Sequence, residues 1–231
     1  MIEPYYEQDG ITIYHGDSRD VLPSLAAGSV DLFVTDPPYG MAFGGFRGVD
    51  ANVSADGARQ GIRLVRQVLH EARDVMSAEA HYLLFCHWES WPDFYDAASP
   101  FFAIKNALIW YKDRGGMGDT DMEYARDYEV ILYGVRGRRA IDGKRDGAVI
   151  TGYPPVRSQL REHPTQKPVE LLAHLIGKHA PIGGLVPDPF MGSGTTLRAA
   201  KDLGRRAIGI EINEDYCKIA VERLRQSVLA L

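Results

Sequence analysis

Residues 183–204, which read GGLVPDPFMGSGTTLRAAKDLG, decide the expected fold. An apolar run that ends at Val186 is followed by an acid, a glycine-rich turn and apolar residues at helical spacing, which predicts strand, tight turn and helix. Glycines in such a turn let a ligand approach the backbone closely, and the amino end of a helix favours an anionic group. No lysine follows the last glycine, so this is not a phosphate-binding Walker loop.

The next stretch repeats this pattern. Residues 205–228, RRAIGIEINEDYCKIAVERLRQSV, predict a strand, a turn and a helix, with Glu211 at the end of the strand. In a doubly wound sheet, an acid at this point typically accepts hydrogen bonds from a ribose diol. Together the two stretches predict a ligand that contains a nucleoside and carries an anionic end.

Strands and helices alternate along the rest of the chain. Apolar runs predict strands at 10–17, 29–35, 80–88, 103–112 and 128–134, and helical spacing predicts helices at 18–25, 58–76 and 167–180. This alternation indicates one α/β domain over residues 1–231 with a mostly parallel sheet. The irregular basic segment 136–162 is a candidate insert, because it is too small for a core of its own.

The composition is that of an ordinary soluble globular protein, with 45% apolar and 25% charged residues. The apolar runs are shorter than the ~20 residues that a membrane span needs, and the acidic amino terminus lacks the apolar core of a signal peptide. We therefore expect a cytoplasmic protein. Cys86 and Cys217 lie far apart, and no cluster of cysteine and histidine has metal-ligand spacing, so we expect no metal.

The net charge is −5, but the charges are unevenly distributed. From Arg136 to Lys167, eight basic residues stand against three acidic ones, which gives +5 and leaves −10 for the rest of the chain. A polyanion senses such a local patch, because salt screens charges beyond about 8 Å, whereas the alternative is a solvated loop without a partner. The residues expected to contact a polyanion are Arg136, Arg138, Arg139, Lys144, Arg145, Arg157 and Arg161.

Residues 34–40, VTDPPYG, end a predicted buried strand with an acid, two prolines and an aromatic residue. A plain turn explains such a stretch. A site that grips a flat polar amine explains it as well, because Asp36 and the Pro37 carbonyl offer two acceptors. Proline fixes φ, which aims that carbonyl, and Tyr39 offers a ring on which a base can stack.

Four stretches in this order resemble motifs of the β class of DNA amino-methyltransferases, which modify N6 of adenine or N4 of cytosine. They are IYHGDSRDVLPSL with SVDLFVTDPPYG, HPTQKPVELL, DPFMGSGTT and GIEINEDY. The resemblance implies a Rossmann-like methyltransferase fold with a mostly parallel seven-stranded sheet, helices on both faces and a circularly permuted motif order. It also implies S-adenosylmethionine as the cofactor and DNA as the substrate.

Carried over residue by residue, the resemblance also implies how the cofactor is held. Lys167 would reach its carboxylate, Glu211 its ribose and Asp17 its adenine amine, although Asp17 could instead cap a helix. Asp36 would border both the cofactor and the target base. The methionine end of the cofactor would be lined by Asp188, Phe190, Gly192, Ser193, Gly194 and Thr195.

The resemblance assigns catalysis to Asp36, Pro37, Pro38 and Tyr39. The target amine would donate to Asp36 and to the Pro37 carbonyl, and its freed lone pair would attack the sulfonium methyl of a cofactor held in line. The base would first be flipped out of a duplex, or taken from a single strand. Aspartate at the head of the motif favours adenine.

Several alternatives stay open at this point. They are an N4-cytosine DNA methyltransferase, an RNA methyltransferase and an inactive cofactor-binding subunit, although the intact motif favours activity. The short insert indicates a short or degenerate recognition sequence. We expect a bacterial or phage-encoded modification enzyme of the kind found in restriction-modification systems, without an attached nuclease, and the class allows a homodimer.

Overall fold

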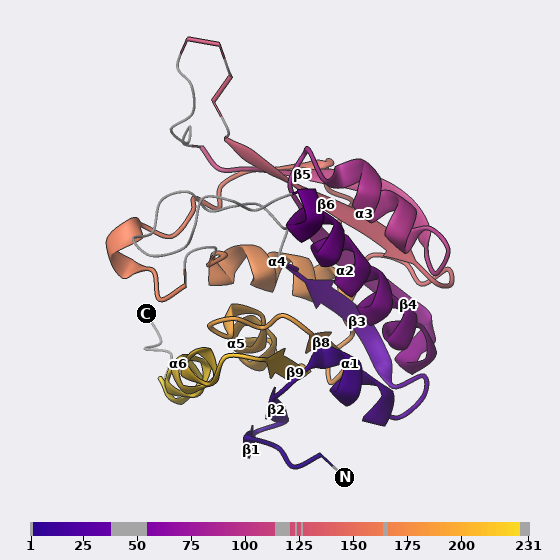
Figure 1. The fold of residues 1–231 in the computed structure, drawn as a ribbon, viewed down its shortest axis with the longest axis vertical. Helices are drawn as coiled ribbons and strands as arrows, with labels where there is room; N and C mark the ends of the chain where they lie inside the picture. Colours follow the sequence, from indigo (N-terminus) through magenta and orange to yellow (C-terminus); the bar gives the residue numbers. More distant parts are fainter. Residues whose placement is uncertain are drawn as a thin grey trace.

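The structure, a computed structural model, describes residues 2–37, 55–113, 121–122, 124–125, 127–163 and 166–226 (Figure 1). Their strands form two hydrogen-bonded sheets, of order β1-β2-β9-β8 and β3-β4-β6-β5-β7. The strand bounds are β1 Tyr6–Gln8, β2 Ile11–His15, β3 Val30–Thr35, β4 Met76–Cys86, β5 Ala103–Tyr111, β6 Tyr128–Val135, β7 Val149–Ile150, β8 Leu185–Asp188 and β9 Arg206–Glu211.

The two sheets adjoin where β3 lies beside β8 (Figure 1). Across this boundary the Asp31 carboxylate accepts a hydrogen bond of 3.0 Å from the Leu185 backbone N–H. Parallel ladders join β2 to β9, β9 to β8, β3 to β4 and β5 to β7, whereas β1, β4 and β5 each have an antiparallel neighbour. The predicted α/β fold is therefore confirmed. The predicted count of seven strands is not, because the described residues form nine.

Strand β3 is buried on both faces, which explains its nearly continuous apolar sequence. Leu32 and Val34 belong to one hydrophobic cluster, whereas Val30 and Phe33 belong to the other. Successive side chains of a strand point to opposite faces, so a strand between two helical layers must be apolar throughout. The same burial places β3 at the centre of the fold and leaves Asp36 at its carboxyl end.

Helices cover both faces of the sheets. Helices α2 (Ala55–Val75) and α3 (Trp91–Ala98) contribute to the cluster around Phe33. Helices α4 (Val169–His179), α5 (Thr195–Asp202) and α6 (Glu214–Arg225) contribute to the cluster around Leu32. The short helix α1 (Ser18–Val21) and two 3₁₀ turns, η1 (Leu22–Ser24) and η2 (Ser158–Leu160), complete the described elements.

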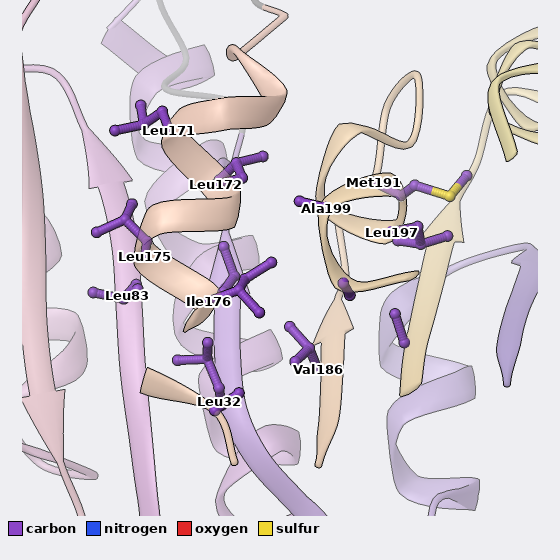
Figure 2. Close-up of a cluster of buried hydrophobic side chains, with 14 of the residues drawn as sticks. Leu32, Leu83, Leu171, Leu172, Leu175, Ile176, Val186, Met191, Leu197 and Ala199 are labelled. Carbon is purple, nitrogen blue, oxygen red and sulfur yellow. The ribbon is translucent and has the colours of Figure 1, made fainter. Parts of the chain in front are cut away.

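Helix α4 packs between the two halves of the fold. In Figure 2, Leu171 and Leu175 point from α4 toward β4, whereas Leu172 and Ile176 point toward β8 and α5. This two-sided packing joins β4, the neighbour of β3, to the strand that ends in the glycine turn. None of the helices that the structure describes is long and apolar enough to cross a membrane.

Candidate active site

A cavity of about 360 Å³ opens at the carboxyl ends of three strands. Asp36 follows β3, Asp188 ends β8 and Glu211 ends β9, and all three line this cavity. Carboxyl ends of neighbouring strands in an open α/β sheet are where such folds bind ligands. Motifs that lie more than 150 residues apart in the chain thus meet in one site.

The glycine turn forms one wall of the cavity. Gly192 and Gly194 have φ values of +52° and +78°, in the left-handed region that favours glycine. A Cβ atom on Gly194 would also lie 2.7 Å from the Cβ atom of Ala220 in α6. The turn therefore requires glycine at Gly194 for both conformation and space. Of the residues predicted there, Phe190, Gly192, Ser193 and Thr195 line the cavity.

The Glu211 carboxylate is held by two backbone N–H groups. Its Oε2 atom accepts from Gly192 and its Oε1 atom accepts from Asn213, both at 2.9 Å. These bonds tie β9 to the glycine turn and fix the carboxylate plane. Each oxygen keeps a lone pair with which it can accept a ligand hydroxyl.

Asp188 is a buried acid with neutral partners. Its carboxylate accepts from the Thr196 hydroxyl at 2.6 Å and from the Phe190 backbone N–H at 3.1 Å. Burial raises the pKa of Asp188 to about 7, and the nearby Asp36 and Glu211 carboxylates act in the same direction. Asp188 is therefore an acid whose charge is costly in this cavity near neutral pH.

Asp36 lies in a chain of alternating charges. Its Oδ2 atom is 2.6 Å from the ammonium of Lys167, which lies 3.0 Å from Glu129 Oε2. The other Glu129 oxygen is 2.7 Å from the Lys112 ammonium. Burial of Lys167 opposes its charge, but the two carboxylates raise its pKa above the ordinary lysine value. The structure thus brings Lys167 to the cavity and pairs it with Asp36, whereas its contact with a cofactor carboxylate stays a prediction. Pro37 lines the cavity too, whereas Pro38 and Tyr39 lie outside the described residues.

Asp17 has a structural partner. It is the N-cap of α1, accepts from the Arg19 backbone N–H at 2.9 Å and forms an ion pair with the Arg19 side chain. It is not among the described residues that line the cavity. The structure shows the helix cap, and a contact with an adenine amine stays a prediction.

Several cavity residues were not singled out from the sequence. His163, Gln166 and Tyr216 line it, and the His163 ring packs edge-on against Tyr216 at 4.5 Å between centroids. His163 and Gln166 lie in the motif that precedes the cofactor loop, which was the signal that could have identified them. Glu129 gave no such signal, because its contact with Lys167 joins positions 38 residues apart.

The basic segment divides between opposite ends of the sheet. Arg136 donates to the Met76 carbonyl at 2.6 Å and to the Arg73 carbonyl, and Arg139 donates to the His179 carbonyl. These carbonyls lie where α2 and α4 end, and helix ends leave carbonyls in need of donors. Both arginines are thus used at helix ends, at the amino end of β4 and away from Asp36.

Arg157 and Arg161 lie in the part of the segment that returns to the cavity. Trp110 Nε1 donates to the Tyr153 carbonyl at 2.9 Å, and Glu162 pairs with Arg223 of α6. The structure therefore does not bring all seven predicted DNA contacts into one surface. Arg138, Lys144 and Arg145 lie with the first half of the segment, between Arg136 and β7. The described residues contain no group of histidine, cysteine, aspartate and glutamate that could hold a metal ion.

Comparison with known proteins finds DNA methyltransferases by both sequence and structure. The sequence model of the N6/N4 DNA methylase family matches residues 30–146 and 142–222. The DNA adenine methyltransferase YhdJ of Escherichia coli (strain K12) is 30% identical over 246 residues, which cover 92% of this chain and 82% of that protein. The M1.HpyAVI–SAM complex is 25% identical, with a TM-score of 0.73, covering 94% of this chain and 100% of that one. The cytosine-N4-specific PvuII DNA methyltransferase shares the fold, with 14% identity, a TM-score of 0.80 and coverage of 99% and 91%.

The cavity fits S-adenosylmethionine. Its volume is within the range of ~300–1,000 Å³ that is typical of small-molecule sites. The oriented Glu211 carboxylate suits a ribose diol, Lys167 suits a carboxylate, and the acids Asp36 and Asp188 suit a ligand with a positive sulfonium and ammonium. The chain belongs to the family of S-adenosylmethionine-dependent DNA amino-methyltransferases.

Proposed function

We propose that this protein methylates the N6 amine of adenine in DNA. The observation that carries the proposal is the position of Asp36, which lines the same cavity as the glycine turn and Glu211. A relative with 30% identity is named a DNA adenine methyltransferase, and aspartate heads the motif here. These two facts favour adenine over cytosine.

The residues after β3 make a weak nucleophile reactive. The lone pair of an exocyclic amine is delocalised into the ring, so the nitrogen must become tetrahedral before it can attack. Asp36 and the Pro37 carbonyl accept the two N–H bonds and hold the amine in that geometry. The cofactor supplies a methyl group on a positively charged sulfur. Holding both reactants in line provides much of the rate acceleration.

The remaining residues of the cavity bind the cofactor. Glu211 accepts the ribose hydroxyls, and Lys167 holds the cofactor carboxylate. An amine inside a duplex is enclosed by pairing and stacking, so it cannot enter the cavity that Asp36 lines. The target base therefore rotates out of the helix, at a cost of a few kcal/mol, and stacks on Tyr39.

A methyl-transfer assay tests the proposal. Tritium from labelled S-adenosylmethionine should appear in DNA and not in RNA or protein, and nucleoside mass spectrometry should identify N6-methyladenine. Asp36→Ala should reduce transfer by about 100-fold or more. Asp96→Ala, which removes an exposed aspartate on α3, is the matched control and should retain activity.

Each other outcome has a defined meaning. N4-methylcytosine as the product would replace adenine with cytosine as the target and leave the role of Asp36 intact. Full transfer by Asp36→Ala would refute the proposed mechanism. Label in RNA alone would refute DNA as the substrate of this site.

A further inference from the structure

Lys167 lies between two buried carboxylates that belong to different strands. Its ammonium is 2.6 Å from Asp36, after β3, and 3.0 Å from Glu129, on β6. Among the residues that the structure describes, these are the two carboxylates within ion-pair distance of Lys167. Glu129 is not among the described residues that line the cavity, so it acts on the site through Lys167.

The Lys167 ammonium and the target amine need the same acceptor. The proposed function requires Asp36 to accept an N–H bond from the target base, and Lys167 already donates to Asp36 Oδ2. An ammonium bound to a carboxylate is a charge-assisted donor and competes well with a neutral amine. The strength of the Lys167–Asp36 contact therefore limits how readily Asp36 accepts the base.

Glu129 offers Lys167 a second acceptor. Burial of Glu129 opposes its charge, but Lys167 and Lys112 together hold its pKa below the usual glutamate value. It therefore stays ionised and attracts Lys167 away from Asp36. Lys112 binds the other oxygen of Glu129 at 2.7 Å and competes with Lys167 for this charge.

We propose that Glu129 is a positioning residue, which draws the Lys167 ammonium off Asp36 and so frees Asp36 to accept the target amine. The inference rests on the proposed function, because it assumes that Asp36 holds the amine. It predicts opposite effects for changes at the two ends of the charge chain. Loss of the Glu129 charge strengthens the Lys167–Asp36 contact, whereas loss of Lys112 weakens it.

Equilibrium DNA binding without cofactor measures this directly. Two unmethylated duplexes are compared, both with the target sequence that the transfer assay identifies. In one the target base has its exocyclic amine, and in the other it lacks that amine. The amine preference is the ratio of their dissociation constants. Glu129→Gln should lower this preference about tenfold, the effect of one charge-assisted hydrogen bond. Lys112→Met should raise it above that of the wild type.

A double variant separates positioning from a general loss of structure. In Glu129→Gln with Lys167→Met, the Lys167 ammonium no longer competes for Asp36, so the amine preference should return to at least the wild-type level. A merely structural role of Glu129 gives no such recovery. Circular dichroism melting of every variant checks that the fold is retained.

The possible failures differ between the two proposals. A wild-type preference that is unchanged in Glu129→Gln, or not recovered in the double variant, overturns the role of Glu129 and leaves the proposed function standing. An amine preference of Lys112→Met that does not exceed that of the wild type overturns it as well. A wild-type protein without methyl transfer to DNA refutes the proposed function, and this inference with it.

Discussion

Replacement of Asp188 by asparagine should stabilise the fold at high pH relative to low pH. The pKa of Asp188 is raised from 3.8 to about 7, chiefly by burial. The folded protein therefore binds more protons than the unfolded chain between these values. The stability that this group contributes is full below about pH 3.8 and is lost as the pH rises through about 7. Asparagine does not titrate, so the Asp188→Asn variant avoids this loss.

The magnitude follows from the two pKa values. With 3.8 for the unfolded chain and about 7 for the folded protein, ionisation of Asp188 removes about 2–3 kcal/mol of stability between pH 5 and pH 8. The free energy of unfolding of Asp188→Asn, minus that of the wild type, should therefore be larger at pH 8 by this amount. For a chain of 231 residues this corresponds to roughly 5–10 °C in melting temperature.

Urea denaturation at pH 5 and pH 8 measures both values. Asparagine cannot accept from the Phe190 N–H and the Thr196 hydroxyl in the same way as a carboxylate, but this cost is present at both pH values and cancels in the difference. Asp96→Asn on the exposed face of α3 is the matched control and should change the difference by less than about 0.5 kcal/mol. A pH-independent effect of Asp188→Asn would show that the buried carboxyl carries no such cost.

Two further substitutions test the packing and the buried histidines. Gly194→Ala should cost about 2–4 kcal/mol of unfolding free energy, because alanine is strained at φ +78° and its Cβ atom would overlap Ala220. Gly204→Ala is the control: its φ is +67° but the space around it is open, so it should cost only about 1–2 kcal/mol in the same urea assay. Equal costs of the two variants would contradict the overlap. Burial lowers the pKa of His179 to about 3, so the wild type should lose about 2 kcal/mol of folding stability relative to His179→Gln as the pH falls from 8 to 5. Melting curves of both proteins measure this loss, and parallel pH profiles would contradict it.

The histidine prediction depends on a proton assignment that the contacts settle. His81 Nε2 lies 3.0 Å from the Arg139 carbonyl, which can only accept, so this nitrogen carries the proton. His81 Nδ1 is then the acceptor for His179 Nδ1, at 3.0 Å. Protonation of His81 at Nδ1 would break this bond inside the core. His81 is therefore neutral in the folded protein, and burial keeps His179 neutral by lowering its pKa, so the stability is present above about pH 6.5 and is lost as the pH falls.

The strands and their terminal acids could be predicted from local sequence. A strand buried on both faces is apolar along its length, so VDLFV and the run before Asp188 are visible as strands, and the acids that end them stand out. Parallel neighbours place such ends at one edge of the sheet. This is why Asp36, Asp188 and Glu211 stand out in the sequence as candidate site residues.

The charge chain could not be predicted in the same way. Glu129 and Lys112 lie in runs of mixed residues, and their contact depends on the antiparallel ladder between β5 and β6, which pairs Trp110 with Glu129. The register of a ladder is a tertiary property. The basic segment shows the same limit, because a count of charges does not reveal that Arg136 and Arg139 serve helix ends.

The three acids of the cavity are stabilised by different partners, and the difference explains why Asp188 carries the stability cost. Asp36 has the Lys167 ammonium at 2.6 Å, and Glu211 has two backbone N–H donors. Asp188 has one hydroxyl and one N–H, and it feels the charge of both other acids. A cationic ligand in this cavity would compensate the charge of Asp188. A cationic side chain of the protein could do the same, but it would occupy the space that the ligand needs. We propose that the fold accepts this unfavourable buried acid because a positively charged cofactor would compensate it, which is a stability cost of the kind that binding sites commonly carry.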